Sequence, residues 1–294
     1  MSIVNQLFIN SLIAASVYTL VAVSFYLIYS TTRFFHFAHA VVFTSGAYFA
    51  YLFHILLGLP LLIAAGLSAA ACAGIGSLLE TGIYRPLRKI GASSMILLLA
   101  SLGIYIVLQN VISILFGDDT KSMRTGDVVE GLNIFGARIT PIQITIILTS
   151  IILVTLVSLF LQKTRMGKAM RAVANDPELA NISGIESNRV IAVTFIIGSA
   201  LTGIAGILVA LDVDMTPTMG MNALMMGVVA VIIGGVGSVP GAALGALLLA
   251  LAQNFGVWKI SSQWQDTIAF TILLVFLLFR PEGFLGKKVK KATI

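Results

Sequence analysis

Long apolar runs recur along the whole chain, and each is close to the length that a helix needs to cross a lipid bilayer. Such a helix takes about 20 mostly apolar residues. Only 10% of the 294 residues are charged, against about 25% in ordinary soluble domains. The sequence therefore predicts an all-α, polytopic transmembrane helical bundle that forms one domain over residues 1–294. It has about eight membrane segments: 8–30, 37–57, 60–81, 93–116, 140–162, 190–211, 266–279 and an interrupted helix pair over 223–258.

The Lys and Arg residues predict which ends of the spans face the cytoplasm, because short cytoplasmic loops carry an excess of them. If the N-terminus lies outside, 14 of the 18 Lys and Arg residues fall in inner segments. We therefore expect an outer N-terminus and a cytoplasmic C-terminus. The C-terminal basic cluster then lies near anionic lipid headgroups, so the lipid bilayer is an expected partner and nucleic acid is not. That cluster consists of Lys287, Lys288, Lys290 and Lys291.

The interrupted pair is the segment where a helix cannot continue. Residues Ala223–Ile233 form only about 16 Å of helix, half a bilayer. A glycine-rich run with one proline follows, and then a second apolar stretch over 242–257. Non-helical backbone at membrane depth needs protein or a water-filled cavity around it, so this hairpin is expected to border a solute path. The alternative is a simple Gly-Pro turn at the inner surface. The residues expected on the path here are Gly234, Gly235, Gly237 and Ser238.

The start of the second predicted span, Arg33–Ala40, combines a basic residue with two histidines and three phenylalanines. Ionisable residues near membrane depth indicate function by default, so Phe37 and His39 are also expected on the path. An interfacial aromatic belt, or a structural hydrogen bond from a histidine, would explain the same pattern. No metal site is expected, because His54 is distant and Cys72, the single cysteine, stands alone in an apolar run.

Two polar connections stand out. Segment 163–189 is the one sizeable inner loop, and within it residues 176–184 predict a short helix with both ends marked. Asp176 suits the N-cap, Pro177 the first helical position, and Gly184 the position just beyond the C-terminus. Glu178 complements the helix dipole, while Leu179, Ala180 and Ile182 supply apolar side chains. A soluble partner could grip such a helix, although a self-packed connector remains the alternative. Segment 117–139 is the longest outer loop and could contact an external partner.

Small residues at four-residue spacing predict tight contacts between helices, because membrane helices associate by close packing. Such stripes are Gly198, Thr202, Gly206 and Ala210 in the sixth span, Gly66, Ala70 and Gly74 in the third, and the Gly241/Gly245 pair.

The inner loop also resembles the E-A-A-x-x-x-G loop of ATP-binding-cassette (ABC) importer permeases, through Glu178, Ala180 and Gly184. The whole chain resembles the branched-chain amino acid ABC permease family, of its H-type. Three stretches carry this likeness: Phe37-Ala38-His39 with Gly46-Ala47-Tyr48; Gly167-Lys168-Ala169-Met170-Arg171-Ala172 through Gly184-Ile185 to Arg189-Val190-Ile191-Ala192; and residues 234–242 with Gly245 and Arg280-Pro281-Glu282-Gly283. Two positions depart from the family pattern: His36 replaces the usual Asn, and Ala40 the usual Gly.

The resemblance implies an inner-membrane permease subunit that passes a small, branched-chain amino acid from an external solute-binding protein to the cytoplasm by alternating access. It implies ATPase subunits that dock on Asp176, Pro177, Glu178, Leu179, Ala180 and Gly184, and a second permease subunit, identical or related. The sequence has no G-x-x-x-x-G-K-[ST] phosphate loop, so neither ATP hydrolysis nor a bound cofactor is expected in this chain.

Other solutes and mechanisms remain open at this point. The same family resemblance covers permeases for urea, amides and other amino acids. A self-sufficient secondary transporter is a different class of protein and would need charged residues deep in its spans. None is evident in the sequence: Gln109, Asn110 and Gln143 are the most polar residues there. A channel is a third class, and no nucleophile–base set indicates a membrane enzyme.

Overall fold

The computed structural model describes residues 2–124, 131–134, 136–280 and 282–286. It confirms the all-α polytopic fold, with eight described helices long and apolar enough to cross a membrane. The long helices are α1 (Ser2–Thr32), α2 (His39–Tyr51), α3 (Leu61–Leu79), α5 (Ser94–Phe116), α6 (Pro141–Lys163), α9 (Ser187–Asp212), α11 (Val239–Gly256) and α12 (Gln265–Phe279). The shorter ones are α4 (Arg85–Lys89), α7 (Arg165–Asn175), α8 (Pro177–Ile182) and α10 (Met219–Gly234).

Short non-α segments extend three of these elements. A π-helical turn over Leu52–Leu56 prolongs α2, and another over Glu80–Tyr84 joins α3 to α4 in one span, Leu61–Lys89. A 3₁₀ turn over Ser262–Trp264 precedes α12.

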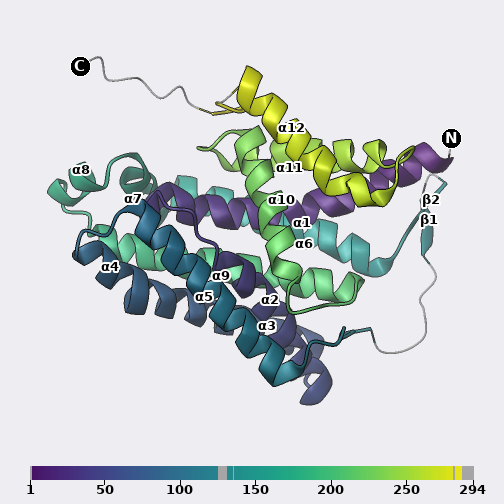
Figure 1. Ribbon diagram of the computed structural model, residues 1–294, viewed down its shortest axis with the longest axis horizontal. Coiled ribbons are helices and arrows are strands. Elements are labelled where there is room, and N and C mark those ends of the chain that lie inside the picture. Colours follow the sequence, from purple (N-terminus) through teal and green to yellow (C-terminus); the bar gives the residue numbers. More distant parts are fainter. Residues whose placement is uncertain (1, 125–130, 135, 281, 287–294) are drawn as a thin grey trace.

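Helix α1 lies at the centre of the bundle, in contact with α6, α9, α10 and α11 (Figure 1). Its C-terminal half is buried, with Leu20, Ala22 and Ile28 at or near zero exposure. Buried residues make up 67% of the α9 span but only 6% of the α12 span. The bundle therefore has a closed core around α1, α2 and α9, and its outer helices present apolar faces suited to lipid or to another protein.

The two ends of the bundle carry different connections. Figure 1 shows α4, α7 and α8 together at one end, and the N-terminus beside a small β-hairpin at the other. The hairpin pairs β1 (Leu132–Ile134) with β2 (Ala137–Ile139) in antiparallel register. The connections predicted inside therefore share one end, and those predicted outside share the other. The part of the outer loop at 125–130 and the C-terminal basic cluster lie outside the described residues.

At the hairpin end, the outer loop is attached to the segment that follows α9. Lys121 and Met215 form a two-way backbone bridge, with N···O distances of 3.0 and 2.8 Å. The Arg124 guanidinium donates to the Asp214 carboxylate at 2.6 Å, and this bond holds the pKa of that exposed carboxyl below its usual range. The loop is therefore tied to the bundle by two adjacent contacts.

The interrupted helix pair is present at the predicted place. Helix α10 begins at Met219, earlier than expected, so its 16 residues give about 24 Å of helix. The chain leaves it through Gly235, whose φ of 97° only glycine adopts easily, and Ser238 caps the 18-residue α11. Because α11 alone reaches spanning length, the pair consists of one full span and one slightly short helix.

Glycines at the predicted seams bring helix backbones into direct contact. A Cβ on Gly206 would overlap the Phe43 carbonyl oxygen of α2, and one on Gly245 would overlap the Ala230 carbonyl oxygen of α10. These two predictions are confirmed.

The predicted seam in α3 is wrong. Gly66 and Gly74 have nothing within 4 Å of an added Cβ, and the face that they share with Ala70 is exposed. The buried face of α3 is the opposite one, with Ala64, Ser68, Cys72 and Gly76. Both faces carry small residues at four-residue spacing, so spacing alone could not tell them apart.

This difference between two faces gives a matched stability test. Replacing Gly206 by Ala forces α2 and α9 apart, and we expect the free energy of unfolding to fall by about 1–3 kcal/mol. Replacing Gly66 by Ala meets open space, so a gain of up to about 1 kcal/mol from helix propensity is expected. Thermal or denaturant unfolding of the two purified variants measures both; equal losses would contradict the assignment of the faces.

Candidate functional site

Helix α8 is a short, rigidly capped helix at the end of the bundle that carries α4 and α7. Asp176 Oδ1 accepts hydrogen bonds from the backbone N–H of Glu178 and of Leu179, at 2.9 and 3.0 Å. At the other end Gly184 has φ 81°, its N–H donates to Asn181 O, and the N–H of Ile185 donates to Ala180 O. This pair of bonds is the Schellman motif. Both predicted caps are confirmed.

The start of α9 fastens α8 to the bundle. Asn181 Oδ1 accepts from the Ser187 N–H at 3.0 Å, and the Ser187 hydroxyl donates to Pro177 O at 3.1 Å. Ala180 is the one buried side chain of α8. These contacts join α8 to α9, which has the highest buried share, 67%, of the described spans. The roles of Asn181 and Ser187 could not be predicted from the sequence, because nothing local marks a contact across the turn.

The outer face of α8 is apolar. Leu179 is 59% exposed and Ile182 is 84% exposed, and both lie outside the membrane spans. Two large apolar side chains on a helix fixed at both ends are suited to a protein partner, because burial of each would contribute about 1.5–3 kcal/mol.

Helix α7 links this surface to α6 and α1. Gly167 lets α7 approach α6, since a Cβ there would overlap the Phe160 carbonyl oxygen, while Met170 and Val173 are buried. Arg33, which connects α1 to α2 and has φ 58°, donates from its guanidinium to Ala174 O. The inner loop 163–189 is therefore a packed part of the bundle.

The glycine turn after α10 is covered by the C-terminal segment. Phe284 N–H donates to Ile233 O and Leu285 N–H donates to Gly234 O, each at 2.9 Å. Added Cβ atoms show the same closeness: one on Gly235 would overlap Gly286 N, and one on Gly234 would overlap the Gly241 carbonyl oxygen. Of the predicted path residues, Gly234 and Gly235 are thus enclosed by backbone packing. Pro281 of the Arg280–Gly283 stretch lies outside the described residues.

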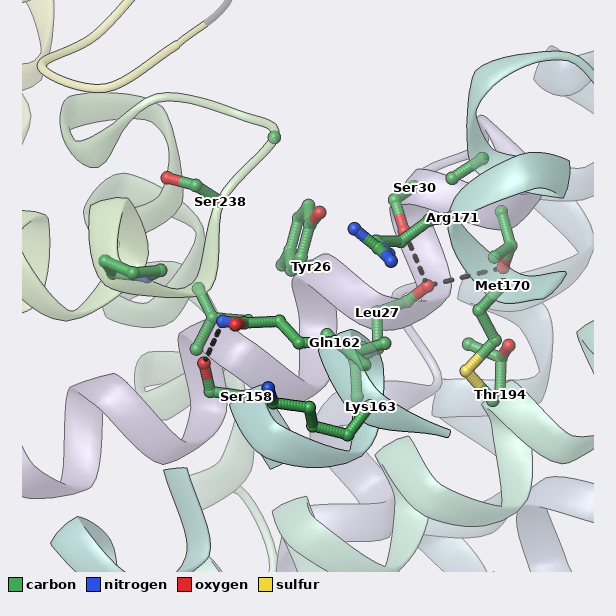
Figure 2. A pocket seen from close by; sticks show the side chains of 16 residues that line it. Tyr26, Leu27, Ser30, Ser158, Gln162, Lys163, Met170, Arg171, Thr194 and Ser238 are labelled. Atoms are coloured by element: carbon green, nitrogen blue, oxygen red, sulfur yellow. Dashed lines mark hydrogen bonds between the residues drawn. The ribbon is translucent and has the colours of Figure 1, made fainter. Parts of the chain in front are cut away.

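Gly237 and Ser238 instead line a cavity of about 480 Å³. It lies between the turn, the ends of α1 and α6, and α7. Figure 2 shows Ser238 across the space from Tyr26, with Arg171, Gln162 and Lys163 also on the wall. The turn is therefore at the same end of the bundle as α7, as the Gly-Pro turn alternative expects, and it also borders a cavity.

Phe37 and His39 hold helices together and do not line this cavity. His39 Nε2 lies 2.8 Å from the Ser24 hydroxyl of α1, and the Phe37 N–H donates to the Ser101 hydroxyl of α5 at 3.0 Å. His39 is fully buried. Among the described residues, no three His, Cys, Asp or Glu side chains come together as metal ligands would.

One buried charged side chain, Glu80, was not predicted from the sequence. Glu80, within the span Leu61–Lys89, is fully buried, and its carboxylate pairs with the guanidinium of Arg88. The sequence alone did not single out Glu80, which lies at the end of the predicted span 60–81. The pair spans the junction of α3 and α4, where removing one partner would strand a buried charge.

Comparison with known proteins adds to this geometry. The family model described as "Branched-chain amino acid transport system / permease component" matches residues 7–278. The chain belongs to this permease family. The permease is 34% identical to the high-affinity branched-chain amino acid transport system permease protein BraD of Pseudomonas aeruginosa and 32% identical to LivH of Escherichia coli. Each match covers 96% of this chain and 95% of the relative.

A solved structure supports the fold. PsaBC from Streptococcus pneumoniae, determined in complex with a Fab, superposes with a TM-score of 0.51 and 14% sequence identity, over 93% of this chain and 91% of that one. The relatives are transport permeases, and the chain is a transport subunit of that family.

The two departures from the family pattern lie in the core of the permease. Tyr84 brings its hydroxyl to 3.1 Å from His36 Nδ1, and His36 is fully buried. The Ala40 carbonyl oxygen would overlap a Cβ on Gly220 of α10. Both positions therefore shape helix packing, and neither lines the cavity beside Ser238.

The cavity wall can be probed with a thiol reagent. The native Cys72 is fully buried, so the unmodified permease should react slowly. Replacing Ser238 by Cys should produce rapid labelling by a small charged methanethiosulfonate, because this position borders the cavity. Labelling of S238C as slow as that of the parent would contradict the assignment of Ser238 to the wall.

Proposed function

We propose that the permease is the membrane-spanning subunit of an ABC importer that moves a small branched-chain amino acid from an external binding protein to the cytoplasm. The substrates named for its relatives support the solute class. The eight spans support passage through the membrane by alternating access. The chain has no phosphate-binding loop, so the energy reaches it from ATPase subunits.

The observation that carries this proposal is the exposed apolar face of α8. Leu179 and Ile182 would enter an ATPase subunit, while the caps at Asp176 and Gly184 keep the helix from fraying under load. Movement would pass through the Asn181–Ser187 contacts to α9 and through Gly167 to α6. The proposed coupling helix, residues 176–184, also includes Pro177, Glu178 and Ala180.

The orientation follows the distribution of basic residues. The end with α7 and α8 would face the cytoplasm, together with the C-terminus, and the N-terminus would lie outside. The β-hairpin end would then meet the external solute-binding protein. The exposed apolar helices leave room for a second permease subunit, identical or related, beside this single domain in the inner membrane.

The solute path is proposed to pass Gly237 and Ser238, which already border a cavity. The path would be shaped indirectly by residues that hold the surrounding helices together: Phe37, His39, Gly234 and Gly235. Opening towards the cytoplasm would then require the turn and the end of α6, which both line this cavity, to separate.

A charge on the exposed face of α8 should uncouple transport from ATP hydrolysis. In the reconstituted complex, replacing Ile182 by Asp should lower ATP-driven uptake by at least about tenfold, since it removes an apolar contact and buries a charge. Replacing Glu186, which is exposed just beyond α8, by Gln is the matched control and should leave uptake within about twofold. Normal uptake by I182D would contradict docking on α8. Gly184 replaced by Leu should show the same loss with normal membrane insertion, because only glycine adopts φ 81° easily.

Competition separates the solute classes. Uptake of labelled leucine into vesicles that contain the full complex should be reduced by excess isoleucine or valine and unaffected by excess urea. Inhibition by urea alone would replace the proposed solute by an amide and would leave the role of α8 unaffected.

A further inference from the structure

The cavity beside Ser238 carries two positive charges and no negative one. Lys163 and Arg171 are among its sixteen lining residues, none of which is acidic. The ion pairs among the described residues involve other basic side chains, Arg88, Lys121 and Arg124. Figure 2 shows the charged end of Arg171 beside Tyr26, with Gln162 and Lys163 below it. Two unpaired cations in one hollow favour an anionic ligand.

The depth of the cavity points to the lipid headgroup region. Lys163 is the last residue of its span, Val239 is the first residue of its own, and Thr31 lies one residue before the end of the first span. Ends of membrane-spanning helices lie near the boundary between hydrocarbon and headgroups. An anion of high local concentration at that depth is a lipid phosphate.

The surface of α6 that leads to the cavity is apolar and exposed. Leu148, Ile152, Leu156 and Leu159 are each between 48% and 57% exposed. Their spacing of three and four residues continues to Lys163, so all five side chains share one side of α6. An acyl chain can lie along this stripe while its phosphate meets Lys163. A free phosphate ion would use the charges and leave the stripe without a role.

We infer that the part of the cavity at Lys163 and Arg171 binds the headgroup of an anionic phospholipid, with an acyl chain along α6, and that the wall at Gly237 and Ser238 is left to the proposed solute path. Gln162 Nε2 donates to the Ser158 hydroxyl and keeps its second hydrogen for the phosphate. The choice of lipid rests on the proposed orientation, which places this end in the inner leaflet with its negative surface potential. Because Arg171 belongs to α7, the bound lipid would connect α6 to the segment that leads into α8.

Lipid retention tests this inference without any transport step. The full-length permease, released from micelles of mixed phosphatidylglycerol and phosphatidylcholine, is examined by native mass spectrometry. The parent should retain phosphatidylglycerol in preference. The double variant Lys163→Gln/Arg171→Gln should retain it about 25-fold more weakly, at about fivefold for each charge, and Lys163→Gln alone about fivefold more weakly.

The matched control is Arg165→Gln/Lys168→Gln, which removes two exposed charges of α7 that do not line the cavity. It should retain phosphatidylglycerol as the parent does. All variants should have the same melting temperature in phosphatidylcholine alone. If the double variant melts lower there, the comparison of Lys163→Gln with the parent decides the outcome. Equal losses in control and double variant would overturn the site, because diffuse charge would then explain binding. If inorganic phosphate raised the melting temperature of the parent as much as phosphatidylglycerol does, the lipid would be excluded as the ligand.

Discussion

Close approach of helix backbones holds this bundle together. Apolar surface gains little by moving from lipid tails to a protein neighbour, so helix association in a membrane depends on tight packing. Helix α9 shows this most clearly: Gly198 meets Ile28 of α1, Gly203 meets Cys72 of α3, and Gly206 meets Phe43 of α2. An added Cβ would lie 3.0 Å from the Ile28 side chain and 2.6 Å from Cys72 Sγ, and would overlap the Phe43 carbonyl oxygen, so one helix packs closely against three others. The rigidity of the core follows from these contacts.

Because the core is rigid, a movement of α8 would be transmitted to it. Helix α8 is attached to the beginning of α9 by Asn181 and Ser187, and α9 is attached to α1, α2 and α3. A partner that moves α8 therefore acts on the most closely packed part of the bundle. Through α7 it also acts on α6 and on the cavity beside the glycine turn. The same connections make α8, the cavity and the core respond together.

The sequence predicts local features of this fold well, because the bilayer and the helix ends impose local rules. Span lengths follow from hydrocarbon thickness, and the caps at Asp176 and Gly184 follow from the unpaired backbone groups of any helix end. Features that depend on partners distant in the chain could not be predicted. Gly66 and Cys72 lie on opposite faces of α3, yet both faces read as small residues. The cover of the glycine turn by Gly283 and Gly286 joins segments with no shared pattern, and the first turn of α10 packs through Gly220 against the distant Ala40 carbonyl.

The permease is proposed to be driven by ATP hydrolysis on separate partner subunits. Uptake of leucine against its concentration gradient, measured with the purified permease alone in liposomes, tests this proposal. We expect no accumulation of leucine above the external concentration, with or without ATP or an ion gradient, and accumulation only when ATPase subunits and ATP are supplied together. Concentrative uptake by the permease alone would contradict it.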